Sequence, residues 1–256
     1  MSYDEELHQL IERLEEMPYS VARSELLLQA LKLSELMQDE SLQYNLRQDL
    51  VSSTANSGQF HLAFVHLTWL LTKSDNAPKL YPIDAILGLY ENVCQALGDY
   101  SSITFKQGIA QLEDFGRRVT ETGGDRSNYL KLLIHYLIDC GRDLEAKQAF
   151  DEMLASIEDE YDYASTWELH SVVQYHIHFG ELALAEKKAM MLYRAHMNGY
   201  SVPDYIYLSM VEIAFYQKHY NMLPQLLEKH INFIDINART LRVQSKYVYF
   251  QSLING

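Results

Sequence analysis

Residues 128–156 read NYLKLLIHYLIDCGRDLEAKQAFDEMLAS, with an apolar run on each side of a single glycine. Apolar residues recur at helical spacing on both sides of Gly141, with no alternation typical of a β-strand. Gly141 can take the left-handed conformation that ends a first helix. Ala146 would let a second helix lie close to the first, and Phe150 would fill the gap to the next pair. The stretch therefore predicts a helical hairpin.

Similar breaks return along the chain at intervals of roughly 40 residues, inside the period range of helical repeats. Four of the six breaks begin with glycine, and the other two are Met17-Pro18-Tyr19 and Lys218-His219-Tyr220. The glycines are Gly58, Gly98, Gly141 and Gly180. Five residues after the first position of four breaks stands an alanine: Ala22, Ala63, Ala146 and Ala185. A larger apolar residue follows four positions later at Leu26, Leu67, Phe150 and Leu227.

This pattern resembles the tetratricopeptide repeat, whose hairpin carries a glycine, an aromatic residue two positions later, then alanine and an aromatic residue or leucine. Residues 45–76 and 128–156 match it most closely. The period exceeds the roughly 34 residues of that family, and most of the family's first-helix Trp and Gly positions are replaced. The third hairpin is irregular, with Gly108 and Gly116 inside its second helix. Residues 112–146 also look like a set of bacterial tetratricopeptide-like proteins without known activity.

We therefore expect an all-α protein, a tetratricopeptide-like α–α superhelix that forms a single domain over residues 1–256. Six hairpins and a final helix would give 13 helices. The expected hairpins cover residues 3–38, 41–74, 83–122, 127–157, 163–199 and 204–233. Residues 237–254, with Arg239, Arg242 and Lys246, would form the solubilising cap that repeat arrays need.

Composition narrows the class of protein. The chain has 256 residues, with 35 acidic and 21 basic side chains and a formal net charge of −14. This balance counts against nucleic acid, because phosphate binding needs clustered Lys and Arg. Two cysteines rule out a disulfide framework and fit a reducing compartment. The acidic start is unlike a signal peptide, and no apolar stretch approaches the roughly 20 residues that span a bilayer. We expect a cytoplasmic protein that does not contact membranes.

No catalytic motif is found in the sequence. The Gly-x-Ser-x-Gly elbow, the Gly-x-x-x-x-Gly-Lys-Ser/Thr loop, His-Glu-x-x-His and Cys-x-x-Cys are all absent. Gly123-Gly124 has no flanking strand or following Lys motif that would bind phosphate. Cys94 and Cys140 lie near the ends of first helices, where buried free thiols are expected. We predict a protein without catalytic residues, metal or cofactor.

Histidine is the one polar residue type that clusters. His170, Gln174 and His178 would share one stripe of a helix. His135 and Asp139 lie one turn apart on the first helix of the preceding hairpin. These side chains could bind a borderline metal, which accepts imidazole and carboxylate ligands. They could also make a pH-sensitive surface, since imidazole titrates near neutral pH. The simplest interpretation is that they line a groove or cap helices.

The resemblance implies where a partner would bind, because the first helices of tetratricopeptide hairpins line a concave face. Asn and Gln side chains can bind both the N–H and C=O groups of an extended peptide. Only Lys131 is basic in the implied stripe, which does not support capture of a C-terminal carboxylate by paired basic residues. The implied groove consists mainly of amides and imidazoles, with Trp167, Tyr205 and Tyr216 as aromatic anchors: Asn45, Gln48, Ser52, Asn56, Asn92, Gln95, Asn128, Lys131, His135, Asp139, Trp167, His170, Gln174, His178, Tyr205, Glu212 and Tyr216.

We predict a non-enzymatic scaffold or adaptor that binds a protein or peptide on this concave face. Residues 1–40 carry ten acidic and three basic side chains, and residues 158–163 read EDEYDY. These acidic segments favour a basic partner. An alternative is a regulatory subunit in which a peptide or other ligand changes the curvature of the superhelix and acts on a separate effector chain. A metal-dependent enzyme is the third class.

Overall fold

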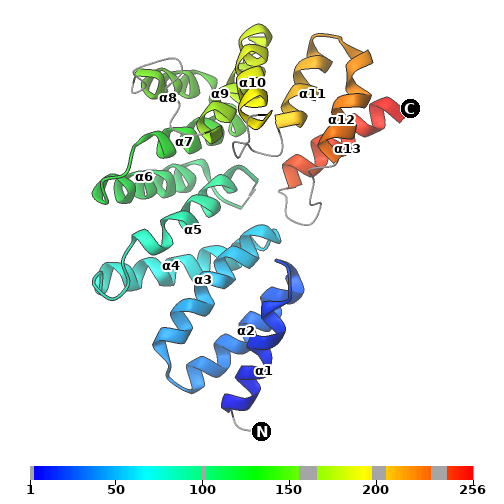
Figure 1. Cartoon of the computed structure of the whole chain (residues 1–256). Helices are drawn as coiled ribbons and strands as arrows, with labels where there is room; N and C mark the ends of the chain where they lie inside the picture. The colour runs from blue at the N-terminus through cyan, green and yellow to red at the C-terminus, as the bar shows by residue number, and fades with distance from the viewer. Residues whose placement is uncertain (1–2, 100–101, 156–165, 198–205, 232–240, 256) are drawn as a thin grey trace. The chain divides into compact units, whose positions relative to one another are not determined.

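The computed structural model describes residues 3–99, 102–155, 166–197, 206–231 and 241–255. Within these ranges the chain forms 13 α-helices and two short 3₁₀ segments, with no β-strand (Figure 1). The predicted all-α class is confirmed. None of the described helices is long and apolar enough to cross a membrane.

The helices follow one another in pairs separated by short turns. The first helices of the pairs are α1 (Tyr3–Glu15), α3 (Glu40–Asn56), α5 (Asp84–Gln95), α7 (Ser127–Asp139), α9 (Thr166–His178) and α11 (Ile206–Tyr216). Their partners are α2 (Val21–Leu36), α4 (Phe60–Asn76), α6 (Phe105–Glu121), α8 (Asp143–Ala155), α10 (Leu182–Met197) and α12 (Leu223–Ile231). The short segments are η1 (Leu97–Asp99) and η2 (Tyr220–Met222), and the last helix is α13 (Leu241–Asn255).

The chain divides into two compact units. Among the described residues, the first comprises 3–99 and 113–124, and the second comprises 102–112, 125–155, 166–197, 206–231 and 241–255. Helix α6 therefore contributes its N-terminal half to the second unit and its C-terminal half to the first.

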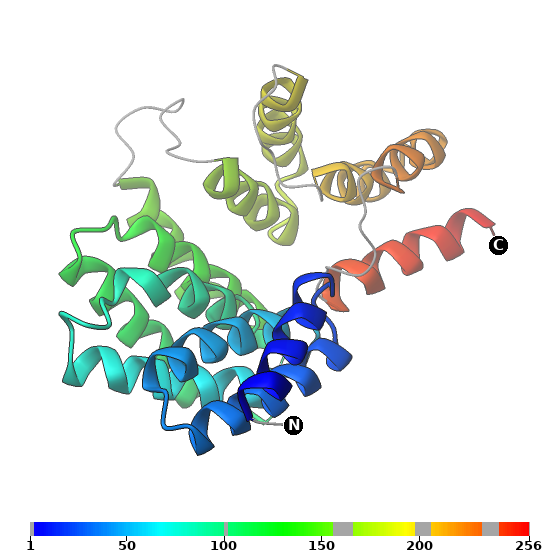
Figure 2. The same ribbon diagram turned by 60° about the horizontal axis from the view of Figure 1, so that its bottom comes forward.

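Consecutive helices of the first unit pack through a leucine-rich core, seen as the blue to cyan helices of Figure 2. Leu27, Ala30 and Leu50 are completely buried between α2 and α3. The buried hydroxyl groups of Ser24 and Ser53 lie 2.9 Å apart where these two helices meet. Short side chains at this contact let the helix backbones approach closely.

Three hairpin turns use glycine as the sequence predicts. Gly58, Gly141 and Gly180 have φ angles of 75°, 67° and 72°, the left-handed region that an L side chain enters only at a cost. The remaining breaks differ. Gly98 lies within the 3₁₀ segment η1, and Lys218 takes the left-handed conformation itself, with φ of 64°.

The predicted small and large positions mostly lie in the core. Ala63, Ala146 and Ala185 are fully buried, and the larger side chains four residues after the first two of them, Leu67 and Phe150, are buried as well. The prediction is wrong for Ala22, which is exposed. In the first hairpin Ser24 occupies the close contact instead. Its hydroxyl group can be buried there because it donates a hydrogen bond to the carbonyl of Ser20.

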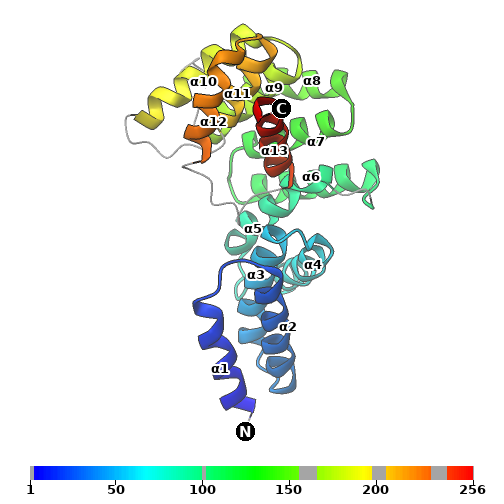
Figure 3. The same ribbon diagram turned by 90° about the vertical axis from the view of Figure 1, so that its right-hand side faces the viewer.

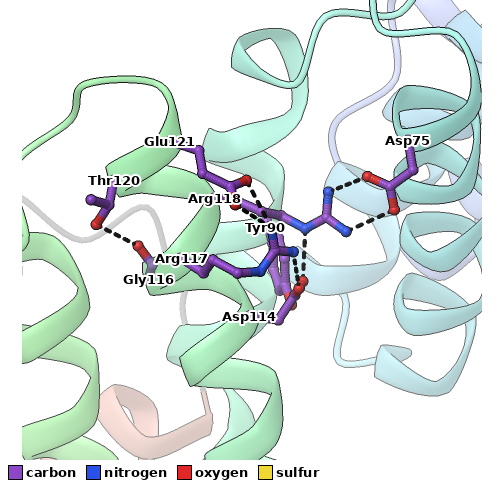
Figure 4. Close-up of polar contacts among 8 residues, drawn as sticks. All are labelled: Asp75, Tyr90, Asp114, Gly116, Arg117, Arg118, Thr120 and Glu121. Carbon is purple, nitrogen blue, oxygen red and sulfur yellow. Dashed lines mark hydrogen bonds and ion pairs between the residues drawn. The ribbon is translucent and has the colours of Figure 1, made fainter.

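The third hairpin is held by large side chains rather than by small ones. Tyr90 of α5 is fully buried and meets Phe115 of α6 edge to face, with ring centroids 5.4 Å apart. The Tyr90 hydroxyl group donates to Asp114 at 3.0 Å. Figure 4 shows Arg118 binding Asp75 at the end of α4 with two nitrogens, at 2.6 and 2.9 Å, and Asp114 with its Nε at 2.7 Å. This ionic cluster joins α4, α5 and α6.

The second unit continues the hairpin pattern from α7 to α12 and adds α13, which contacts α11 and α12 (Figure 3). Phe250 of α13 is buried among the side chains of Leu208, Val211 and Leu227. Where α6 meets α7, the Tyr136 ring stacks on Phe105 with centroids 6.0 Å apart and passes directly over Gly108. Glycine is required at that position because a Cβ atom would overlap the tyrosine ring.

Candidate functional site

A pocket of about 500 Å³ opens in the second unit. It is lined by the C-terminal halves of three successive first helices, α7, α9 and α11, together with the turn after α9, the first residue of α10 and one side chain of α13. The lining is mixed, with aliphatic walls and several hydrogen-bonding groups: His135, Ile138, Gln174, Ile177, His178, Gly180, Leu182, Glu212, Tyr216 and Lys246.

A connected set of polar side chains forms one wall of the pocket. Glu212 is 5% exposed. The Nε2 of Gln174 donates to the hydroxyl oxygen of Ser209 at 2.8 Å and makes a longer contact, 3.5 Å, with Glu212 Oε2. The Nε2 of buried His170 lies 3.2 Å from the same Ser209 hydroxyl oxygen. The chain thus fixes the Gln174 amide with a second layer of polar groups.

Lys246 completes this wall from the C-terminal helix. Its ammonium group lies 2.6 Å from Glu212 Oε1 and donates to Gln174 Oε1 at 3.4 Å. The Lys246 side chain itself is partly exposed, at 29%. A buried carboxylate needs such a partner, because an unpaired charge in a low-dielectric site costs several kcal/mol.

The three clustered histidines lie in different surroundings. His135 and His178 line the pocket, and His178 Nε2 is 3.0 Å from Asp143 Oδ1. His170 is buried. Burial, with the nearby charges of His135 and Lys246, holds the pKa of His170 well below its usual range. His170 therefore stays neutral at physiological pH and is not the titrating member of a pH-sensitive surface.

The part of the chain that the structure describes contains no group of three or more His, Cys, Asp or Glu side chains arranged to hold a metal ion. Asp139 is exposed on α7 and is not among the residues lining the pocket. The hypothesis of a site formed by His135, Asp139 and His178 gains no support from this arrangement. Of the two thiols expected to be buried, Cys94 is buried and Cys140 is exposed, so the prediction is wrong for Cys140.

Five of the groove residues implied by the sequence meet in the pocket: His135, Gln174, His178, Glu212 and Tyr216. Others in the second unit lie apart from it. Lys131 is buried, with its ammonium group 3.1 Å from Asn128 Oδ1. Tyr205, the Trp167 side chain and residues 158–163 lie outside the described part of the chain.

The remaining implied residues belong to the first unit. Asn45, Asn56, Asn92 and Gln95 are exposed, and Gln48 and Ser52 are half-buried. Asn56 uses its amide to donate to the Ser52 carbonyl at 2.8 Å, one turn back in its own helix. None of these six is among the residues that line the pocket.

Sequence reasoning missed Lys246 and the aliphatic walls of the pocket. The sequence places Lys246 in a solubilising cap because its helix lies outside the repeat pattern, and no repeat position predicts where it points. Ile138, Ile177 and Leu182 have the pattern of ordinary core residues. The one usable signal is position, since all three lie within four residues of a glycine turn.

Comparison with protein-family models and with curated proteins finds no match to this chain.

Proposed function

We propose that the chain is a non-enzymatic scaffold or adaptor of the tetratricopeptide-like helical-repeat class, and that it binds a peptide or protein segment in the pocket of its second unit. The class is supported by tandem helical hairpins, by left-handed glycines at three of their turns and by alanines buried at the repeating position. The net charge of −14 favours a basic partner over an acidic one.

The mixed lining of the pocket carries this proposal. Aliphatic side chains from Ile138, Ile177 and Leu182 offer apolar contact, while Gln174, Glu212 and two imidazoles bring polar groups into the lining. Peptide-recognition sites combine these features, since apolar contact supplies affinity and a few oriented polar groups supply register. Tyr216 stands at this pocket with 53% of its surface exposed and is suited to anchor a ligand.

Selection from a random peptide library on the immobilised chain, followed by titration of the selected peptides, tests the proposal. Tyr216→Ala should weaken binding of these peptides by about tenfold or more, the usual loss at an aromatic anchor. Tyr220→Ala is the matched control, because Tyr220 is 55% exposed and is not among the pocket-lining residues. Equal affinities for the wild type and Tyr216→Ala, or the absence of any selected peptide, would overturn the proposal.

A further inference from the structure

Lys246 lies in the lining of the pocket beside Glu212 and Gln174. On α13, Lys246 stands one helical turn before Phe250, whose buried side chain anchors the helix. Both residues therefore lie on the face of α13 that contacts the rest of the second unit. Several other described side chains of this helix, including Val248, Tyr249 and Leu253, are exposed. Lys246 is therefore a polar contact through which the last helix reaches the pocket.

The groups that receive the Lys246 ammonium are set by α9 and α11, and not by α13. Glu212 Oε1 and Gln174 Oε1 converge on one nitrogen atom, at 2.6 and 3.4 Å. Gln174 is held with its oxygen toward that nitrogen because its Nε2 donates to Ser209. Two oxygens from different side chains converging on one atom suit an ammonium group, whereas a guanidinium prefers two parallel bonds to a single carboxylate.

The pocket also provides for the carbon chain that carries an ammonium group. Ile138, Ile177 and Leu182 line it, and lysine methylene groups pack well against such apolar surface. An anionic ligand would face the buried Glu212 carboxylate, which disfavours it. The chemistry of the site thus selects a primary amine on an aliphatic stem.

We infer that Glu212 and Gln174 form a recognition site for a lysine side chain of the partner peptide, and that Lys246 fills this site within the unbound chain. The inference deepens the proposed function and rests on it for the identity of the ligand. Binding of the partner then exchanges one ammonium for another at Glu212, so the buried carboxylate is never left without a cation. The exchange releases the contact that Lys246 of α13 makes with Glu212 and Gln174.

A chemical-rescue experiment tests the site without knowledge of the natural partner. Lys246→Ala removes a stem and ammonium that n-propylammonium can replace. We expect n-propylammonium to raise the melting temperature of Lys246→Ala saturably, as a ligand specific for the folded state does. The wild type and the Lys246→Ala/Glu212→Gln double variant should show no saturable rise. Tetramethylammonium, which has no N–H donor, is the control ligand.

Absence of a saturable rise in Lys246→Ala, or an equal rise in the double variant, would overturn the inference. If Lys246→Ala does not fold, the wild type decides: Nε-acetylation of the lysine in a selected peptide should weaken binding at least about tenfold. Glu212→Gln should remove that difference, and unchanged affinity on acetylation would overturn the inference. If acetylation of the peptide lysine leaves the affinity unchanged while Tyr216→Ala still weakens binding, the lysine site is overturned and the peptide-binding proposal is retained.

Discussion

At the scale of single residues, close packing and burial decide what each side chain can do. Gly108 is the clearest case, because it lies in the first turn of α6, where the Tyr136 ring leaves no room for a Cβ atom. Tyr136 is itself buried and stacked on Phe105, so it cannot easily move away.

Gly108→Ala should therefore lower the free energy of unfolding by about 2 kcal/mol, a typical cost of overpacking. Gly88→Ala is the matched control. Gly88 lies in α5, and no atom stands within 4 Å of the position that a Cβ atom would take, so alanine there should raise stability by about 0.5–1 kcal/mol. Urea denaturation measures both. A neutral Gly108→Ala, or a cost that persists in a Tyr136→Leu background, would contradict the packing argument.

His66 in the first unit makes stability depend on pH. It is 5% exposed, and its Nδ1 lies 2.9 Å from Arg47 Nη1. Burial and the Arg47 charge lower the pKa of His66 to about 4. The unfolded chain, with an ordinary histidine pKa near 6.5, therefore binds a proton that the folded chain excludes between these two values. The contribution of His66 to stability is complete above about pH 6.5 and is lost as the pH falls toward 4.

We expect this loss to be about 2 kcal/mol between pH 6.5 and 4. His66→Gln retains an acceptor for Arg47 and cannot titrate, so its stability should fall less over the same range. Urea unfolding at several pH values, in a Trp167→Phe background where Trp69 is the remaining tryptophan, would follow the first unit. Parallel pH profiles for the variant and its parent would show that His66 is not responsible.

At the scale of helices, ionic contacts and hairpin turns hold neighbouring elements together. Arg118 and Arg117 are adjacent in α6, and both bind Asp114. Only Arg118 is buried and reaches another helix, through Asp75. Hydrogen bonds from Arg118 lower the pKa of Asp75. Burial alone would raise the pKa of Asp114, but hydrogen bonds from Arg118 and Arg117 outweigh the effect of burial, so the pKa of Asp114 is lowered as well.

Arg118→Ala should cost about 2 kcal/mol, because it removes the buried guanidinium that joins Asp75 to Asp114 and leaves Asp114 with only its contacts to Arg117 and Tyr90. Arg117→Ala, which removes an exposed arginine from the same helix, should cost less than about 1 kcal/mol. Thermal and urea denaturation compare the two variants directly. Similar losses for both would mean that the contact between α4 and α6 does not contribute as the buried geometry indicates.

The sequence predicted the helices well and the site only in part. Helix ends follow from local chemistry, as at Gly58, Gly141 and Gly180, and apolar spacing marks the buried faces. The Arg118–Asp75 and Lys246–Gln174 contacts join residues 43 and 72 positions apart, and no local pattern encodes them. Five residues of the pocket were predicted because they lie at the same face of successive first helices.

At the scale of the whole molecule, charge sets how a partner is approached. The net charge of −14 should attract a lysine-bearing peptide over a distance comparable to the Debye length. We expect the association rate of a selected peptide to fall about tenfold between about 50 mM and 500 mM NaCl, with a smaller change in the dissociation rate. Stopped-flow fluorescence measures both. A salt-independent association rate would show that the acidic surface does not steer the partner.

Methyl-resolved NMR of the full chain tests whether the pocket of the second unit binds peptide. Titration with a selected lysine-containing peptide should shift the methyl signals of Ile138, Ile177 and Leu182, which line the pocket. Ile86, buried in the first unit, serves as the internal reference and should not move. Saturable shifts confined to the pocket would agree with the account. Shifts confined to the first unit, with the pocket methyl groups unchanged, would contradict it.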